Sequence, residues 1–257
     1  GKKVLITSSV ELNNKIAREI LRFDGIPIAM PMIKFEPNSE ARSIFLGHSP
    51  KITNYDWIAI TSPASAKIFF IMLNENRYDL RRLPKIMSSG SETTKEILKY
   101  GINPDLQAES DFGSDGLLKK ASLVLSPGDT VLRICSDKSL KDLSEGLRNR
   151  NFKVDEIILY KTIPLKYNNL PEFDAIFFAS PSAVEAFKNN FGNDILIEKD
   201  VISLGNITAD TIKKTFKSTG KIFIPEKSTG IIAIQKYALN YLNEFLWSNA
   251  KSLQEDK

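Results

Sequence analysis

Histidine and cysteine are almost absent from this chain of 257 residues, which contains one of each. Multi-histidine and thiolate zinc sites are therefore excluded, because both need several such ligands. The lone cysteine, Cys135, has no partner for a disulfide within the chain, and a single cysteine in an apolar stretch fits a reducing compartment. We therefore expect a protein without a bound metal.

Glycine-rich phosphate loops and long hydrophobic runs are also missing. No stretch matches Gly-x-x-x-x-Gly-Lys-[Ser/Thr], and the turn at 7–9 lacks the glycines of a dinucleotide fingerprint. No run approaches the roughly 20 apolar residues of a membrane span, and the opening apolar run is too short for a signal peptide. We expect no nucleotide cofactor, no membrane contact and a location in the cytoplasm.

Charge of one sign is not concentrated anywhere in the chain. Lys and Arg number 35 against 31 Asp and Glu, so the formal net charge is +4, and the two signs are interspersed. Composition therefore does not indicate a nucleic-acid binder, and it is compatible with a modest attraction for small acidic molecules. The length allows one or two domains, and we expect two small ones.

Short β-branched runs alternate with amphipathic helical patterns. The run 4–6 is followed by apolar residues at helical spacing, among them Leu12, Ile16 and Ile20, and this pattern ends near Gly25. Such alternation is typical of an α/β fold with parallel sheets and crossover helices.

The chain also resembles itself at a displacement of about 120 residues, far above the 20–50 residues of repeat arrays. Four pairs of similar segments follow one another in the same order: 21–28 with 147–154, 56–66 with 174–184, 86–94 with 201–209, and 114–118 with 228–232. We infer one internally duplicated domain. Equivalent extended segments, 28–35 and 154–162, each run towards a proline and predict a two-strand hinge.

Two Ser-Pro pairs follow predicted strands, and open parallel sheets bind ligands at the carboxyl ends of their strands. Ser62 and Ser180 are suitable N-caps, and the N–H groups of Ser65 and Ala183 are candidates for holding a carboxylate. Neighbouring hydroxyl groups add possible donors: Thr61, Ser65 and Ser182. The alternative is that Ser-Pro merely starts a helix in each half.

Gly90 and Gly205 end predicted strands and precede Thr93 and Thr208 at helix starts. Glycine lets a ligand approach the backbone closely, and the threonine hydroxyl is a donor. Helix capping is the alternative for an isolated Gly-x-x-Thr. Together these segments offer neutral donors suited to a large, flexible polyanion.

Two further side chains carry possible chemistry. Tyr160 ends an apolar connector strand, where it is either a packing residue or a phenol that donates a proton to a leaving group. Arg133 and Lys138 flank a turn, where they are either cations for a carboxylate-rich ligand or solvated surface charges.

These segments resemble those of the uroporphyrinogen-III synthases. The similarity comprises strand-[Thr/Ala]-Ser-Pro-x-[Ala/Ser] in each half, Gly-x-x-Thr-Ala at 205–209, Val-Leu-Arg at 131–133, and a strand ending in Tyr-x-Thr at 160–162. It runs in order from about Val4 to Tyr241. The first half departs from the family at Thr93-Thr94, where Thr-Ala is usual.

This resemblance implies two flavodoxin-like lobes with parallel sheets, one from residues 1–36 plus 165–257 and the other from 37–164, joined by two strands with the substrate cleft between them. The implied substrate is hydroxymethylbilane, a linear tetrapyrrole with eight carboxylates. The family cyclises it without a cofactor, with loss of water and inversion of the last pyrrole ring. The implied protein is a monomeric lyase of tetrapyrrole (haem) biosynthesis.

By the same resemblance, Tyr160 matches the tyrosine proposed to assist loss of the hydroxyl group, and Thr208 matches a threonine at the substrate cleft. The sequence thus predicts Tyr160 as the catalytic residue and the following substrate-binding residues: Thr61, Ser62, Ser65, Gly90, Thr93, Arg133, Ser180, Ser182, Ala183, Gly205 and Thr208. Two other classes stay open. One is a non-catalytic bilobed protein that binds a small anion, and the other, less favoured, is a receiver-like or nucleotide-binding α/β module.

Overall fold

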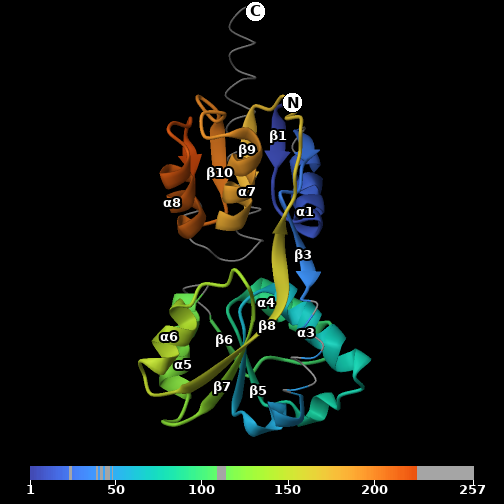
Figure 1. Cartoon of the computed structure of the whole chain (residues 1–257), viewed down its shortest axis with the longest axis vertical. Helices are drawn as coiled ribbons and strands as arrows, with labels where there is room; N and C mark the ends of the chain where they lie inside the picture. Colours follow the sequence, from blue (N-terminus) through green and yellow to red (C-terminus); the bar gives the residue numbers. More distant parts are fainter. Residues whose placement is uncertain are drawn as a thin grey trace, which may run out of the picture. The chain divides into compact units, whose positions relative to one another are not determined.

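The structure is a computed structural model that describes residues 1–22, 25–38, 40, 43, 47, 49–108 and 114–224. The chain divides into two compact units, the first formed by Gly1–Lys34 with Ile163–Lys257 and the second by Phe35–Thr162. Each unit contains a sheet with helices on its faces (Figure 1), which confirms the α/β class. The unit boundaries lie two residues before the predicted lobe boundaries.

The first unit has a sheet of order β11-β10-β9-β1-β2, in which all neighbouring strands are parallel. Its strands are β1 (Lys3–Ile6), β2 (Ile26–Ala29), β9 (Ala175–Phe178), β10 (Asp200–Ser203) and β11 (Ile222–Phe223), and its helices are α1 (Val10–Arg22), α7 (Pro181–Phe191) and α8 (Asn206–Thr215). Apolar residues of α1 pack on one face of this sheet and those of α7 and α8 on the other.

The second unit has a sheet of order β3-β8-β7-β4-β5-β6, in which β4 to β8 pair in parallel. Its strands are β3 (Ile33–Pro37), β4 (Trp57–Ile60), β5 (Lys85–Ser88), β6 (Leu106–Gln107), β7 (Thr130–Ser136) and β8 (Lys153–Pro164), with β3 and β8 crossing the unit boundaries. Its helices are α3 (Pro63–Glu75), α4 (Ser91–Leu98), α5 (Ser114–Val124) and α6 (Asp142–Arg148), with 3-10 turns at Ser49–Asn54 and Leu80–Arg82. The helices α3 and α4 cover one face, and α5 and α6 the other.

The two sheets share one strand order, because β2-β1-β9-β10-β11 of the first unit corresponds to β8-β7-β4-β5-β6 of the second. In both sheets an aspartate that precedes one strand also accepts a backbone N–H at the amino end of the neighbouring strand. The Asp174 carboxylate accepts the backbone N–H of Lys3 at 2.7 Å, and the Asp56 carboxylate accepts that of Thr130 at 2.8 Å. The backbone N–H and the side-chain hydroxyl of Thr130 both donate to Asp56, and these hydrogen bonds lower the pKa of the Asp56 carboxyl group. We interpret the correspondence as the structural counterpart of the repeated sequence; the repeat copy at 228–232 lies outside the described residues.

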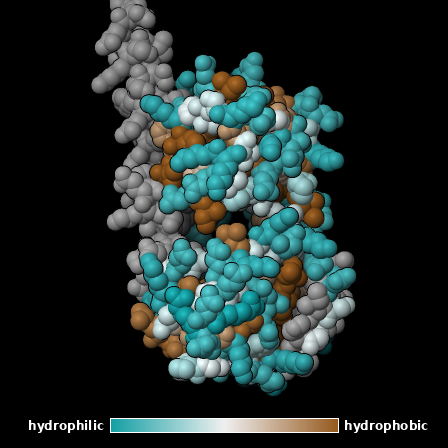
Figure 2. Space-filling model, turned by 60° about the vertical axis from the view of Figure 1, so that its left-hand side comes forward, coloured by the Kyte–Doolittle hydropathy of each residue, from teal (hydrophilic) through white to brown (hydrophobic). Residues whose placement is uncertain are grey.

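Burial on both faces explains why the central strands are almost wholly apolar. All four residues of β4 and of β9 are buried. Hydrophobic residues that remain exposed, such as Leu123 and Ile207, are spread over several elements. The face drawn in Figure 2 is largely hydrophilic, with hydrophobic residues in separate patches. None of the helices in the described ranges has both the length and the apolar character that a membrane crossing requires.

The order of strands fixes where each unit is open to a ligand. In the first unit the chain proceeds outward in opposite directions from β1 and β9, and in the second from β7 and β4. Helices following these strands pack on opposite faces of each sheet, the arrangement in which open parallel sheets bind ligands at the carboxyl ends of the paired strands. Each unit therefore has a preferred ligand position at that edge of its own sheet.

Candidate active site

Most of the predicted site residues lie at the carboxyl edge of their own sheet. In the second unit, 61–65 follow β4, 90–93 follow β5, and Tyr160 lies near the end of β8. In the first unit, 180–183 follow β9 and 205–208 follow β10. Strand order alone thus brings together, within each unit, residues that are up to about a hundred positions apart in the sequence.

The Tyr160 side chain reaches the start of α3. Its hydroxyl lies 3.2 Å from Ser62 Oγ, which in turn lies 2.9 Å from Ser65 Oγ. The Tyr160 ring packs edge-on against Phe35, with 5.3 Å between ring centroids, and the residue is 4% exposed. The phenol is therefore held in place by packing and belongs to a short row of three hydroxyl groups.

The structure confirms the predicted N-caps, Ser62 and Ser180, and their geometry bears on the prediction that the Ser65 and Ala183 amides hold a carboxylate. Ser62 Oγ accepts the N–H of Ser65 at 3.0 Å, and Ser180 Oγ accepts that of Ala183 at 3.3 Å. The prediction that the Ser65 and Ala183 amides hold a carboxylate was therefore wrong, because each amide is already bonded to its own N-cap. Pro63 and the equivalent proline of α7 have no N–H to offer.

The starts of α8 and α4 differ from those of α3 and α7 because neither has a side-chain cap. Among the residues that the structure describes, the first-turn amides of Asn206, Ile207 and Thr208 have no partner. Three amides at a helix start, together with the positive end of the helix dipole, form a site suited to an anion. In the first unit the anion-binding capacity therefore lies at the Gly-x-x-Thr segment 205–208.

The two threonines of these segments are buried and keep an available hydroxyl. Thr93 is 4% and Thr208 is 5% exposed, and neither hydroxyl has a hydrogen-bond partner within the described ranges. Neither is among the fully occluded unpaired atoms of those ranges, which are Tyr78 Oη and Arg133 Nε, so both hydroxyls still reach solvent. The adjacent Thr94, by contrast, is bonded to Ser88 at 2.6 Å. Each helix start therefore presents a threonine hydroxyl that a ligand or a water molecule can use.

Neither backbone geometry nor packing requires glycine at position 205. Its φ of −173° is extended backbone that any residue adopts, and a Cβ placed there meets no atom of the described residues within 4 Å. A glycine next to three first-turn amides without a partner in the described residues fits a position where a ligand approaches the backbone.

The prediction that Arg133 binds substrate was also wrong, because its guanidinium is buried and bonded within the protein. The residue is 2% exposed, and its guanidinium bonds to the Glu156 carboxylate, the Ser144 hydroxyl and the Leu140 carbonyl at 2.7–2.9 Å. Hydrogen bonds from Ser144 and Arg133 lower the pKa of Glu156 against the opposing effect of desolvation. Arg133 therefore fastens α6 to β7 and β8.

Cys135 does not belong to the candidate site. Burial raises the pKa of its thiol to about 11, so this cysteine is a poor nucleophile at neutral pH. Over the described ranges no group of three or more His, Cys, Asp or Glu side chains is placed to hold a metal ion.

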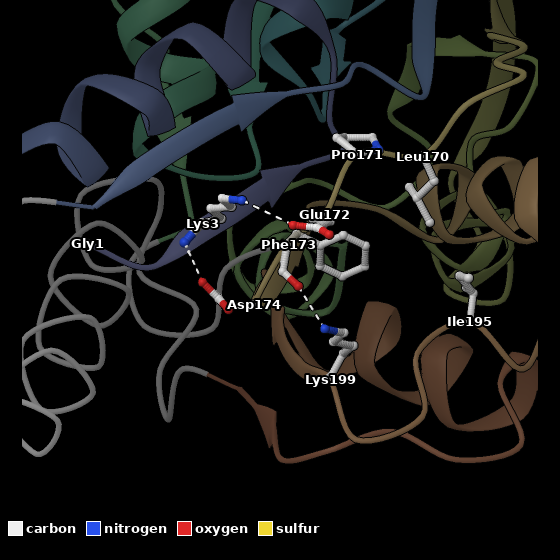
Figure 3. Close-up of a pocket in the computed structure, with 9 residues that line it drawn as sticks. All are labelled: Gly1, Lys3, Leu170, Pro171, Glu172, Phe173, Asp174, Ile195 and Lys199. Atoms are coloured by element: carbon white, nitrogen blue, oxygen red, sulfur yellow. Dashed lines mark hydrogen bonds and ion pairs between the residues drawn. The ribbon is translucent and has the colours of Figure 1, made fainter. Parts of the chain in front are cut away.

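A surface hollow of about 540 Å³ lies in the first unit at the opposite edge of the sheet (Figure 3). Lys3 and Asp174, which line it, stand at the amino ends of β1 and β9. Its charged groups are satisfied locally, since the Lys3 ammonium pairs with Glu172 at 3.4 Å and the Lys199 ammonium bonds to the Phe173 carbonyl at 2.9 Å. The hollow is therefore separate from the candidate site.

Comparisons with known proteins agree with the fold and show the family. A family model described as uroporphyrinogen-III synthase HemD matches residues 14–229. The chain is 28% identical over 240 residues to the porphyrin biosynthesis protein HemD of Ruminiclostridium josui, an alignment that covers 89% of this chain and 46% of that protein. It is 25% identical over 227 residues to the chloroplastic uroporphyrinogen-III synthase of Oryza sativa subsp. japonica, covering 82% of this chain and 72% of that protein. The chain thus spans about half the length of the R. josui relative.

Two solved structures share the fold over nearly the whole chain. A variant of uroporphyrinogen III synthase from Thermus thermophilus superposes with a TM-score of 0.61 at 14% identity, covering 99% of this chain and 100% of that one. The uroporphyrinogen-III synthetase of Helicobacter pylori 26695 gives 0.60 at 14% identity, covering 93% and 99%. With the family model extending over far more than half of its length, the chain belongs to the uroporphyrinogen-III synthase family.

Proposed function

We propose that this protein is a uroporphyrinogen-III synthase, a lyase that cyclises hydroxymethylbilane with loss of water and inversion of the last pyrrole ring. The observation that carries the proposal is the pair of uncapped helix starts at α4 and α8, each with a buried threonine whose hydroxyl is available. A substrate with eight carboxylates needs several such donors, and neutral donors release a polyanionic product more readily than a cluster of fixed charges would.

In this proposal Tyr160 assists the first chemical step. Its phenol donates a proton to the terminal hydroxyl of the bilane, so that the C–O bond breaks and water leaves, and the pyrrole N–H proton returns to the phenolate as the azafulvene forms. The Ser62 hydroxyl, at 3.2 Å, is placed to hold the phenol in position by a hydrogen bond. The resulting azafulvene then attacks the substituted position of the last pyrrole, and the spiro intermediate fragments and recloses. These later steps depend on holding the two ends of the substrate, which is a positioning task.

The experiment that tests the function is incubation with hydroxymethylbilane followed by chromatographic separation of the oxidised products. We expect mainly the type III isomer, because spontaneous closure gives type I. The activity should survive exhaustive dialysis against a chelator. Binding of the bilane with formation of type I alone would favour the alternative, a non-catalytic bilobed binding protein. The substrate cleft between the lobes, the monomeric state and the cytoplasmic location stay predictions.

Thr208→Val tests the α8 part of the site. Valine keeps the shape of threonine and removes the donor. We therefore expect the transition state to lose about 1–2 kcal/mol of stabilisation, which lowers kcat/KM roughly five- to thirtyfold. Steady-state kinetics of type III formation measure the effect. Thr211→Val is the matched control, because the Thr211 hydroxyl bonds to the Ile207 carbonyl of its own helix at 2.9 Å. Equal losses in the two variants would show that the site has been misplaced.

A further inference from the structure

The turn at the end of β7, residues 136–139, lies at the point in the second unit where the strand order reverses. It follows the strand that lies between β8 and β4, and therefore stands between Tyr160 on one neighbouring strand and the Ser62 cap that follows the other. Ser136 pairs with Tyr160 in the sheet register, and the Asp137 N–H donates to the Tyr160 carbonyl at 3.2 Å. The loop is thus directly beside the proposed catalytic residue.

Hydrogen bonds fix this loop in one conformation. The Ser136 N–H donates to Ser139 Oγ at 2.9 Å, and the Lys138 N–H donates to Ser136 Oγ at 3.3 Å. The Asp137 carboxylate accepts the Thr162 N–H at 2.9 Å. The backbone at Lys138 is therefore held in place, while its ammonium makes no hydrogen bond or ion pair with the residues that the structure describes.

Lys138 is an exposed cation, and among the described residues its ammonium has no carboxylate partner. The neighbouring Asp137 is occupied by a backbone amide instead. With Arg133 buried against Glu156, Lys138 is the cation that the β7 turn presents to solvent. A flexible four-carbon stem and a compact ammonium suit a mobile carboxylate.

We propose that Lys138 is a further substrate-binding residue, which takes one carboxylate of the acidic substrate beside Tyr160. The proposal rests on the proposed function and adds a charged contact to a site otherwise built from neutral donors. The equivalent turn of the first unit, at 7–9, contains Thr, Ser and Ser, so the contact is specific to the second unit. A long-range attraction of this kind acts on substrate binding and leaves the bond-breaking steps unchanged.

The test compares wild-type protein with Lys138→Ala, Lys138→Gln and Lys138→Arg in type III formation at several ionic strengths. We expect the Ala and Gln variants to raise KM about three- to tenfold with kcat within about twofold, and Arg to restore KM. We also expect KM of the wild type to rise more steeply with salt than KM of the Ala variant. Lys153→Ala is the matched control, since Lys153 is exposed at the opposite end of the same sheet, where β8 begins; its KM should stay at the wild-type value.

Each outcome decides a different claim. Wild-type activity with an unchanged KM in both the Ala and the Gln variants overturns the role of Lys138 and leaves the proposed function standing. Loss of kcat with KM unchanged also overturns it, because that result assigns Lys138 to the chemical steps. A wild-type protein that forms only type I overturns the proposed function together with this inference.

Discussion

Replacing Tyr160 with phenylalanine is expected to lower the turnover of hydroxymethylbilane by about ten- to a hundredfold, the lower part of the range for loss of a general acid. Phenylalanine keeps the edge-on contact with Phe35 and the packing of a residue that is 4% exposed. Only the hydroxyl is lost, and Ser62 Oγ retains its bond from the Ser65 amide. The variant should therefore fold like the wild type and lose rate alone.

Single-turnover kinetics at saturating protein separate this chemical effect from binding. Tyr55→Phe serves as the control, since Tyr55 precedes β4 at the amino edge of the same sheet, where its hydroxyl donates to the Asp155 carboxylate at 2.6 Å. Turnover of Tyr160→Phe at the wild-type rate would assign Tyr160 to packing, the alternative that the sequence left open.

Gly205→Leu is expected to abolish most of the activity, by about a hundredfold in kcat/KM, while leaving the fold intact. A Cβ at this position meets none of the described residues within 4 Å and strains no backbone dihedral, so we expect the folded state to accept the substitution. In the proposed complex the same space is occupied by substrate held against the first-turn amides of α8. Displacing the ligand by an ångström or more has a large effect on the positioned reaction.

Thermal unfolding and kinetics measured on the same preparation test whether Gly205→Leu loses activity without losing stability. Lys213→Leu adds an equally large apolar side chain to an exposed position of the same helix and should be nearly neutral in both measurements. A Gly205→Leu protein with a normal melting temperature and wild-type kinetics would show that no ligand approaches this helix start.

Much of the fold was accessible from the sequence because it depends on local patterns. Alternating strand and helix periodicity predicted the α/β class, and the N-cap rule correctly placed the starts of α3 and α7. The connectors are extended as predicted, although the first is interrupted at 30–32 between β2 and β3. These features need only neighbouring residues, so one sequence is sufficient to predict them.

The failures concern contacts between distant residues. Arg133 looked like a surface cation because nothing local shows that Glu156 lies opposite it in the sheet and that Ser144 bonds to its guanidinium. A usable signal was present: an arginine in the middle of an apolar strand that is buried on both faces needs an internal partner. The Ser65 and Ala183 amides were misassigned although the N-cap rule itself implied that the serines occupy them.

The direct test of the central claim is the fraction of type III product as protein concentration rises at a fixed amount of hydroxymethylbilane. Spontaneous closure to type I proceeds at a rate that does not depend on protein. The rate of type III formation by a synthase increases with protein concentration, so a larger fraction of the substrate becomes type III. We expect the type III fraction to rise with protein towards nearly all of the product, and to rise less steeply with Tyr160→Phe. A product that stays type I at every concentration of folded protein, even where the bilane is bound, would contradict the account.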